Sequence, residues 1–249
     1  MPGAQSWMEP LPVRRVARTA DTTPTGQGWP ATLAPVGQLL RDGLDLGRAT
    51  ILVGENGTGK STIVEAIAMA YGMNAEGGST GARNRTWESE SVLHDSLRIE
   101  RGPGASTWGY FIRAETMHGL FTYLDGSRAG SHTLDPEFHR LSHGESFLSL
   151  LHTRRFLGAG FFVLDEPEAG LSFTAQLGLI GALADLAGRS GTQVLIATHS
   201  PILASLPGAT ILELDEDGFH ETRFEDLAVV EHYRRFLDGP ERYLRHVVD

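Results

Sequence analysis

The chain carries at residues 54–61 the run Gly54-Glu55-Asn56-Gly57-Thr58-Gly59-Lys60-Ser61. This run satisfies the phosphate-binding loop pattern G-x-x-x-x-G-K-[ST] at every constrained position. The apolar, β-branched residues 49–53 before it predict a buried strand, and residues 61–70 after it are apolar at helical spacing. In this arrangement backbone N–H groups and a helix N-terminus surround phosphate oxygens. We therefore expect a nucleotide site in which Lys60 reaches the β- and γ-phosphates and the Ser61 hydroxyl ligates Mg²⁺.

The lysine in this loop is unusual for the chain. Lysine and arginine together number 21, and Lys60 is the single lysine. A sequence that otherwise carries its positive charge on arginine favours a site at this position that requires a compact ammonium group. The nucleotide-binding residues expected from the loop are Gly54, Asn56, Gly57, Gly59, Lys60, Ser61 and Thr62.

Bulk composition narrows the class of protein. The 249 residues are 41% hydrophobic and 21% charged, as in globular domains. The net charge of −10 argues against a protein that binds nucleic acid over a generally basic surface, although one local basic face is still compatible with it. Without cysteine there is no disulfide, thiol chemistry or cysteine zinc site. Because no secretory signal or apolar run of membrane-spanning length is visible, we expect a cytoplasmic protein without membrane insertion.

Strands and helices alternate along the chain. Apolar runs at 108–113, 161–164, 193–197 and 210–214 predict strands, and residues 144–156 and 171–186 predict helices. We expect an edge strand within 12–17, a polar glycine-rich loop at 74–85, mixed structure with loops at 117–140 and a helical tail from 226. Such alternation indicates a mainly parallel sheet covered on both faces.

Two motifs place reactive side chains at the ends of predicted strands. Asp165 and Glu166 follow the run 161–164, so both carboxylates should lie at the carboxyl edge of the sheet, where α/β proteins bind ligands. Asp165 is expected to hold Mg²⁺ and Glu166 to act as general base on the attacking water. His199 follows the next apolar strand, within 197–201, and could meet the γ-phosphate and orient the water.

A second anion-binding helix start is predicted at Leu141-Ser142-His143-Gly144-Glu145-Ser146. We take Ser142, Gly144 and Glu145 as candidate nucleotide-binding residues. One ATP needs only one triphosphate site. The second helix start therefore suggests action on a nucleotide held by another copy of the chain.

Together these stretches resemble the ABC-type ATPase family. Residues 54–61 match its Walker A motif, 141–145 its LSGGQ-like signature, 161–166 its Walker B motif, and His199 its switch histidine. The resemblance covers about residues 48–215, with four motifs in the right order. The runs 165–172 and 197–201 look like the stand-alone predicted ATPases often labelled AAA family ATPases, related to the RecF/SMC/OLD branch rather than to transporters.

The resemblance implies an α/β P-loop NTPase fold, with a mainly parallel sheet, flanking helices and a small inserted lobe that carries the signature. It implies one domain over 1–249, with a nucleotide core at about 36–72 and 159–215, an inserted lobe at about 73–158 and a helical tail at about 226–249. It also implies that ATP and Mg²⁺ bind at the interface of an ATP-dependent homodimer, a two-fold isologous assembly.

The chain departs from the family pattern at several positions. His143 stands where many members have glycine, and Glu145-Ser146 where transporters have Gly-Gln. Glu115 follows a predicted strand where the family has its Q-loop glutamine, and we take it as a candidate Mg²⁺ ligand. Ser172 stands near the place of the D-loop aspartate. Trp29 is the candidate for stacking on adenine.

Three functions stay open at this stage. The first is a soluble ATPase whose dimer opens and closes with ATP, with DNA maintenance or defence as a candidate process. The arginine pairs at 14–15, 154–155 and 234–235 are either contacts to DNA or solvated faces. Arg83 and Arg85 are either solvated loop arginines or contacts to nucleotide or partner. The second is the nucleotide-binding subunit of a membrane transporter, and the third is an ATP-gated interaction module with little hydrolysis. A P-loop kinase is more distant, because the signature would then have no role.

Overall fold

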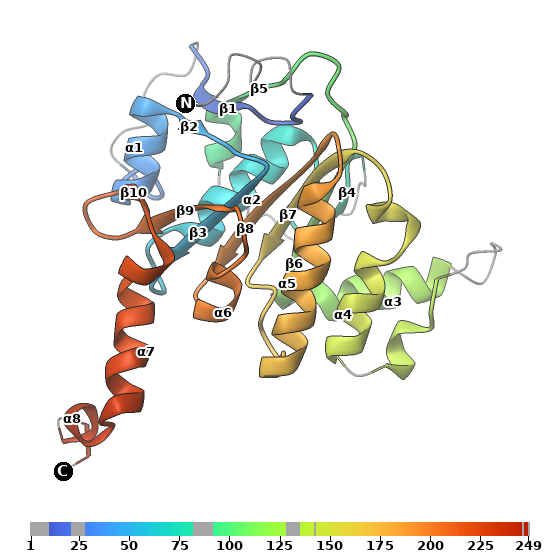
Figure 1. The fold of residues 1–249 in the computed structure, drawn as a ribbon. Helices are drawn as coiled ribbons and strands as arrows, with labels where there is room; N and C mark the ends of the chain where they lie inside the picture. The colour runs from blue at the N-terminus through green and yellow to red at the C-terminus, as the bar shows by residue number, and fades with distance from the viewer. Residues whose placement is uncertain are drawn as a thin grey trace.

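A seven-stranded sheet forms the centre of the chain (Figure 1). The structure, a computed structural model, describes residues 10–20, 28–81, 92–127, 135–141, 143–245 and 247–248. The strand order is β10-β9-β3-β8-β7-β6-β4. The strands are β3 (Ala49–Gly54), β4 (Gly78–Ser79), β6 (Gly109–Arg113), β7 (Gly160–Asp165), β8 (Thr192–Thr198), β9 (Thr210–Leu214) and β10 (Phe219–Thr222).

The five inner strands are parallel, and the two edge strands, β4 and β10, are antiparallel to their neighbours. Every residue of β7 and β8 is buried, which is the pattern of parallel strands covered on both faces. The predicted mainly parallel α/β sheet is confirmed.

Alternate residues of each inner strand serve two separate hydrophobic cores. Along β7, Phe162 and Leu164 face one core, and Phe161 and Val163 face the other. The first core is closed by α3 (Met117–Ser127), α4 (His143–Leu151), α5 (Phe173–Gly188) and α6 (Pro201–Ala204). The second is closed by α1 (Ala34–Asp42), α2 (Lys60–Tyr71) and a small sheet. Figure 1 shows these two layers on opposite sides of the strands.

The small sheet has the order β2-β1-β5 and is antiparallel, with β1 (Arg15–Arg18), β2 (Leu44–Asp45) and β5 (Leu97–Glu100). One buried side chain ties it to the large sheet. Gln193, at the start of β8, accepts from Val13 N at 2.8 Å and donates to Val13 O at 2.6 Å and to Gly47 O at 2.8 Å. Its amide thus satisfies main-chain groups that would otherwise be buried without partners.

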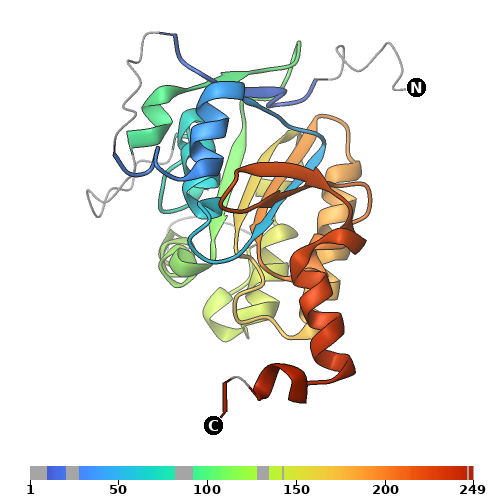
Figure 2. The ribbon, with the colours of Figure 1, turned by 90° about the vertical axis from the view of Figure 1, so that its left-hand side faces the viewer.

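The chain ends in α7 (Ala228–Asp238) and α8 (Glu241–Leu244), which extend away from the sheet in Figures 1 and 2. Short 3₁₀ turns occupy Val92–Ser96, Ala114–Thr116, Phe138–Arg140, Arg154–Phe156 and Phe224–Asp226. Within the described part of the chain, no helix combines the length and the apolar character needed to cross a bilayer.

Two local predictions were wrong. The helix expected over 144–156 ends at Leu151, where the Thr153 hydroxyl bonds the Leu150 carbonyl at 2.7 Å and a 3₁₀ turn follows. The strand expected at an edge within 12–17 is β1, which spans 15–18 and lies between β2 and β5 rather than at an edge. Residues 117–127, in the region expected to hold mixed structure with loops, form α3. Its buried residues Met117, Phe121 and Leu124 recur at helical spacing and pack into the first core.

The segment predicted as an inserted lobe is divided between several layers. Its strands β4 and β6 belong to the large sheet and β5 to the small one, while α3 and α4 help α5 to close the first core. The lobe at about 73–158 therefore stays a prediction.

Candidate functional site

The phosphate loop joins the end of β3 to the start of α2, as predicted. Gly57 and Gly59 have φ of 86° and 96°, values that L-residues with a side chain rarely adopt. A Cβ on Gly54 would lie 2.4 Å from the Leu214 carbonyl oxygen at the end of β9. The loop therefore requires glycine at position 54 because the Leu214 carbonyl leaves no room for a side chain, and at positions 57 and 59 because the backbone has positive φ.

Lys60 is buried, with 3% of its surface exposed, and its ammonium group bonds the loop itself. Nζ donates to the carbonyl oxygens of Gly54 and Glu55, at 2.8 Å each. Burial lowers the pKa of Lys60, and the carboxylates of Glu166 and Asp165 oppose that shift. The ammonium is therefore held at the loop and lies in the field of both predicted carboxylates.

The sheet register brings the loop, the carboxylates and the histidine to one edge. β8 lies between β3 and β7, with Val53 opposite Thr198 and Asp165 opposite Ala197. The residues that follow these strand ends are the phosphate loop, His199 and Glu166. Parallel strands share one carboxyl edge, so this convergence follows from the strand order.

Glu166 has an unusual backbone. Its φ is 49°, and it is the sole non-glycine residue with positive φ in the described ranges. Such a conformation is costly for a residue with a Cβ and is found where the surrounding structure enforces it, often at active sites. Its Oε1 lies 3.7 Å from His199 Nδ1, and both side chains are partly exposed. The pair can thus face a substrate above the sheet edge.

Asp165 ends β7 with its carboxylate buried. Burial raises its pKa from 3.8 to about 6, against the lowering effects of the Arg113 guanidinium and the Ser61 hydroxyl. Its Oδ1 has no hydrogen-bond partner among the described residues. A buried, unpartnered carboxylate oxygen near a hydroxyl is a donor set that suits Mg²⁺, which prefers oxygen ligands. The residues present therefore fit the expected ion, and Ser61 and Asp165 stay the predicted ligands.

Arg113 was not anticipated from the sequence. At the end of β6 it pairs with Glu65 of α2 at 2.5 Å, with Asp165 at 3.4 Å and with Glu115 at 3.7 Å. Its place as the last residue of a predicted strand was visible in the sequence, but its carboxylate partners follow from the strand order and register. Glu115 is 81% exposed and reaches this cluster through Arg113. Its role as a metal ligand stays a prediction.

The signature residues lie on a different part of the molecule. Gly144 is the second residue of α4, and an added Cβ there would lie 3.5 Å from Ala175 of α5 and from Leu171, just before α5. In Figure 1, α4 lies beside α5 and away from β3. Glu145 is exposed on the same helix. Ser142 lies outside the described residues, as do Arg83 and Arg85.

Other predicted positions are placed as follows. Ser172, near the expected D-loop position, caps α5 by accepting a hydrogen bond from Ala175 N at 3.3 Å. Trp29 is 65% exposed and precedes α1, and its role in adenine stacking stays a prediction. Leu33, in the same connection, would be 3.1 Å from a Cβ on Gly59, so this segment packs on the phosphate loop.

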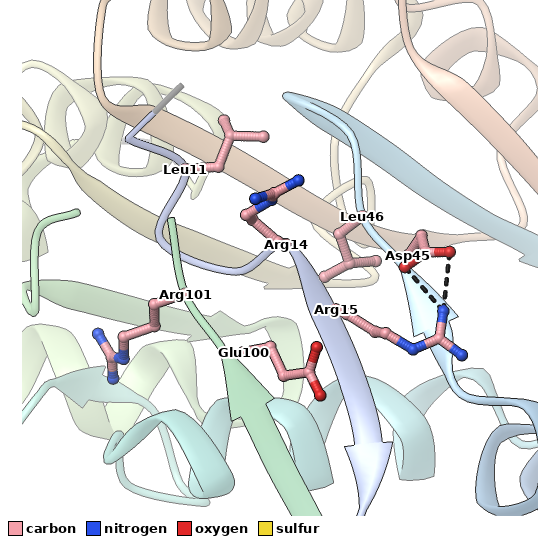
Figure 3. A pocket seen from close by; sticks show the side chains of 7 residues that line it. All are labelled: Leu11, Arg14, Arg15, Asp45, Leu46, Glu100 and Arg101. Carbon is pink, nitrogen blue, oxygen red and sulfur yellow. Dashed lines mark hydrogen bonds and ion pairs between the residues drawn. The ribbon is translucent and has the colours of Figure 1, made fainter. Parts of the chain in front are cut away.

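A separate pocket of about 490 Å³ lies at the small sheet, lined by Leu11, Arg14, Arg15, Asp45, Leu46, Glu100 and Arg101 (Figure 3). Two of its cations are already engaged. Arg15 pairs with Asp45 at 2.8 Å, and Arg101 stacks over the Tyr71 ring at 4.1 Å. The pocket adjoins the segment that enters β3, at the opposite strand end from the phosphate loop, and is not part of that site.

Comparisons with known proteins bear on the class. Residues 44–114 match the family model described as "AAA domain", and residues 140–205 match "AAA domain, putative AbiEii toxin, Type IV TA system". The zinc import ATP-binding protein ZnuC of Vibrio cholerae is 30% identical over 158 residues, which cover 63% of this chain and 58% of that protein. An uncharacterized ABC transporter ATP-binding protein of Haemophilus influenzae is 23% identical, with 79% and 81% covered.

A solved structure titled "An inward-facing conformation of a putative metal-chelate type ABC transporter" has a TM-score of 0.48 and 17% identity, and covers 90% of this chain and 88% of that one. The family models and curated relatives, with the motif order, support the assignment of this chain as an ABC-type P-loop ATPase. The chain spans under three fifths of the length of the ZnuC protein it matches.

Proposed function

We propose that this chain binds Mg-ATP and hydrolyses it at the interface of two copies. The observation that carries the proposal is the pair Glu166–His199, with 3.7 Å between Oε1 and Nδ1, at the sheet edge that also bears the phosphate loop. A carboxylate and an imidazole beside a phosphate cradle are the groups needed to activate water and orient it toward a γ-phosphate.

Each residue of the site has a role in this chemistry. Lys60 exchanges its bonds to the Gly54 and Glu55 carbonyls for phosphate oxygens, and the loop N–H groups bind the remaining oxygens. Ser61 and Asp165 would hold Mg²⁺, which when bound neutralises charge on the phosphates. Glu166 takes a proton from water.

The partner copy completes the site. Gly144 faces α5, and α4, the helix that carries it, lies away from β3 in Figure 1. A second copy related by a two-fold axis can present its signature helix to this loop and receive the same contact in return. In this arrangement Ser142, Gly144 and Glu145 contact the partner's ATP.

The test combines turnover with oligomeric state. Glu166→Gln should abolish Mg-ATP turnover while keeping the site's shape, and light scattering should show a dimer of this variant with Mg-ATP and a monomer without it. Glu216→Gln, an exposed residue in the turn after β9, is the matched control and should behave as wild type. A variant that stays monomeric with ATP contradicts the two-copy site, and undiminished turnover contradicts the role of Glu166.

A second candidate function is the ATP-binding subunit of a membrane transporter. The names of the curated relatives favour it, since they include zinc import ATP-binding proteins and an ABC transporter ATP-binding protein. Copurification of the chain with a permease from the membrane fraction would support this candidate. Recovery without any membrane partner favours the stand-alone ATPase, and a salt-dependent gel shift with ATP then tests DNA as its partner. Wild-type turnover that Glu166→Gln abolishes rules out a non-hydrolysing interaction module.

A further inference from the structure

Glu168 lies two residues beyond Glu166, in the turn that follows β7, and is 7% exposed. A single oxygen of its side chain, Oε1, accepts three hydrogen bonds. The donors are Thr198 Oγ1 at 2.6 Å, His199 N at 3.0 Å and Ser200 N at 3.2 Å. These three residues form the junction between β8 and α6, so one carboxylate holds the backbone of the predicted switch histidine.

Joining two loops through a buried carboxylate has a high free-energy cost. Moving an ionised group out of water costs several kcal/mol unless hydrogen bonds compensate. Its other oxygen, Oε2, is buried and has no hydrogen-bond partner among the described residues. Bonds from N–H groups to a carboxylate are about twice as strong as neutral ones and fix the direction of the main chain. Glu168 therefore stabilises one orientation of the junction.

The turn that carries Glu168 also carries the predicted base. Glu166 adopts positive φ, and its carbonyl accepts from Ala169 N at 3.0 Å, so the chain folds back toward β8. As a result the His199 ring lies between two carboxylates. Its Nδ1 is 3.7 Å from Glu166 Oε1, and its Nε2 is 3.9 Å from Glu168 Oε1. The geometry of the Glu166–His199 pair thus depends on Glu168.

The junction is fixed from its other side as well. Ser200 Oγ donates to Gln176 Oε1 at 2.7 Å, and Gln176 Nε2 donates to the Leu171 carbonyl at 3.2 Å. Leu171 N in turn bonds the Glu168 carbonyl at 2.9 Å. The contacts form a closed ring through the start of α5, and a ring leaves the histidine backbone little freedom to move.

We propose that Glu168 is a positioning residue for ATP hydrolysis: through the backbone of His199 it keeps the imidazole beside Glu166. The inference rests on the proposed function. Glu168 does not itself act as a base in this scheme, because its side chain is 6% exposed and its bonded oxygen is already occupied by three donors.

The test is a double-mutant cycle. Glu168→Ala should lower kcat about 10²-fold, the order of loss that misplacement of a catalytic group produces. The dissociation constant for ATP, measured directly, should stay within about twofold. In a His199→Ala background the same change should lower kcat by less than about threefold, since residues that act as a unit are not additive. Glu216→Ala is the control and should be neutral in both backgrounds.

A second variant covers the case in which Glu168→Ala fails to fold. Thr198→Val keeps the side-chain shape nearly constant and removes the bond from Thr198 Oγ1 to Glu168, together with the bond that Oγ1 accepts from Ser200 N. It should lower kcat about tenfold in the wild type and not in the His199→Ala background. Equal losses of kcat in both backgrounds, or weaker ATP binding that accounts for the loss, overturn the positioning role.

Amide hydrogen exchange separates this inference from the proposed function. In Glu168→Ala the amides of His199 and Ser200 should exchange at least about tenfold faster than in wild type. If that variant does not fold, the readout in Thr198→Val is the amide of His199 alone, because Ser200 N also donates to Thr198 Oγ1 at 2.9 Å and loses that bond directly. If amide exchange at these residues is unchanged, Glu168 does not hold the backbone of His199, whatever the ATPase activity of the variant. If the wild type does not turn over Mg-ATP, the proposed function is wrong, and so is the role of Glu168 that depends on it. Faster amide exchange in the variant would still show that Glu168 holds the backbone of His199.

Discussion

Arg113 and Asp165 are register partners on the neighbouring parallel strands β6 and β7, with Arg113 Nε 3.4 Å from Asp165 Oδ2. The same guanidinium bonds Glu65, which lies on α2 behind the phosphate loop. Arg113 thus joins three elements of the site and offsets the charge of two poorly exposed carboxylates. Its side chain is 21% exposed, so solvent screens these pairs only in part.

We expect Arg113→Met to destabilise the nucleotide-free protein by about 3 kcal/mol, the order seen when one partner of a buried ion pair is removed. Urea unfolding at neutral pH measures this directly. Arg98→Met is the matched control, because Arg98 forms an exposed pair with Glu100 and should cost less than about 1 kcal/mol. Equal effects of the two substitutions would show that the cluster does not stabilise the site.

The raised pKa of Asp165 predicts a pH dependence of stability. Burial raises this pKa from 3.8 to about 6, so between these values the folded protein binds a proton that the unfolded chain has lost. The favourable contribution is therefore complete below about pH 4 and is lost as the pH rises through about 6. It amounts to on the order of 3 kcal/mol.

Asp165→Asn removes this titration. Without nucleotide or metal, the variant should gain stability relative to wild type between about pH 4 and pH 6.5, with little further change above. The measurement is the free energy of unfolding in urea across that range. Asp217→Asn, in an exposed turn, should show no such trend. A stability difference that is constant with pH, or that has the opposite sign, contradicts the assignment.

Much of the fold was predictable because its determinants are local. The parallel strands are short apolar runs, and the loop between β3 and α2 is fixed by glycines whose spacing is visible in the sequence. The meeting of Glu166 and His199 could be predicted as well, because each follows a strand and parallel strands share one carboxyl edge.

The interactions that support the site could not be predicted in the same way. Gln193 and Glu168 act through contacts to residues far along the chain, such as Val13 and Thr198. Gln193 is a single polar residue in an apolar run, and Glu168 is a second glutamate after Asp165-Glu166. Neither belongs to a periodic pattern, so the sequence does not indicate which residue each one contacts. Such contacts depend on the strand order and register, which appear only in three dimensions.

Substitution of Gly54 tests how closely the phosphate loop packs against the end of β9. Gly54→Ala would place a Cβ 2.4 Å from the Leu214 carbonyl, so the loop and the end of β9 must separate. We expect a loss of stability of about 1–3 kcal/mol and weaker ATP binding, from calorimetry of unfolding and of nucleotide titration. Gly158→Ala, where an added Cβ meets nothing within 4 Å, is the control. Similar effects of both substitutions would argue against a steric cause.

Lys60 allows a direct measurement of nucleotide binding, because it is the single lysine of the chain. An amine-reactive reagent can modify only its ε-amine and the terminal amine, so mass spectrometry of the peptide around residue 60 reports one site. Without nucleotide, Nζ donates to the Gly54 and Glu55 carbonyls and Lys60 is 3% exposed, so labelling is slow and its rate is followed over a long time course.

Mg-ATP should slow the labelling of Lys60 about tenfold or more at saturation, because the phosphates cover the ammonium and favour its charged form. Labelling of the terminal amine in the same sample is the internal control and should not change. In Gly54→Ala, protection should require a higher ATP concentration, in proportion to its weaker binding. If saturating ATP leaves the Lys60 rate unchanged, the ammonium does not contact the phosphates, and the role assigned to the loop is wrong.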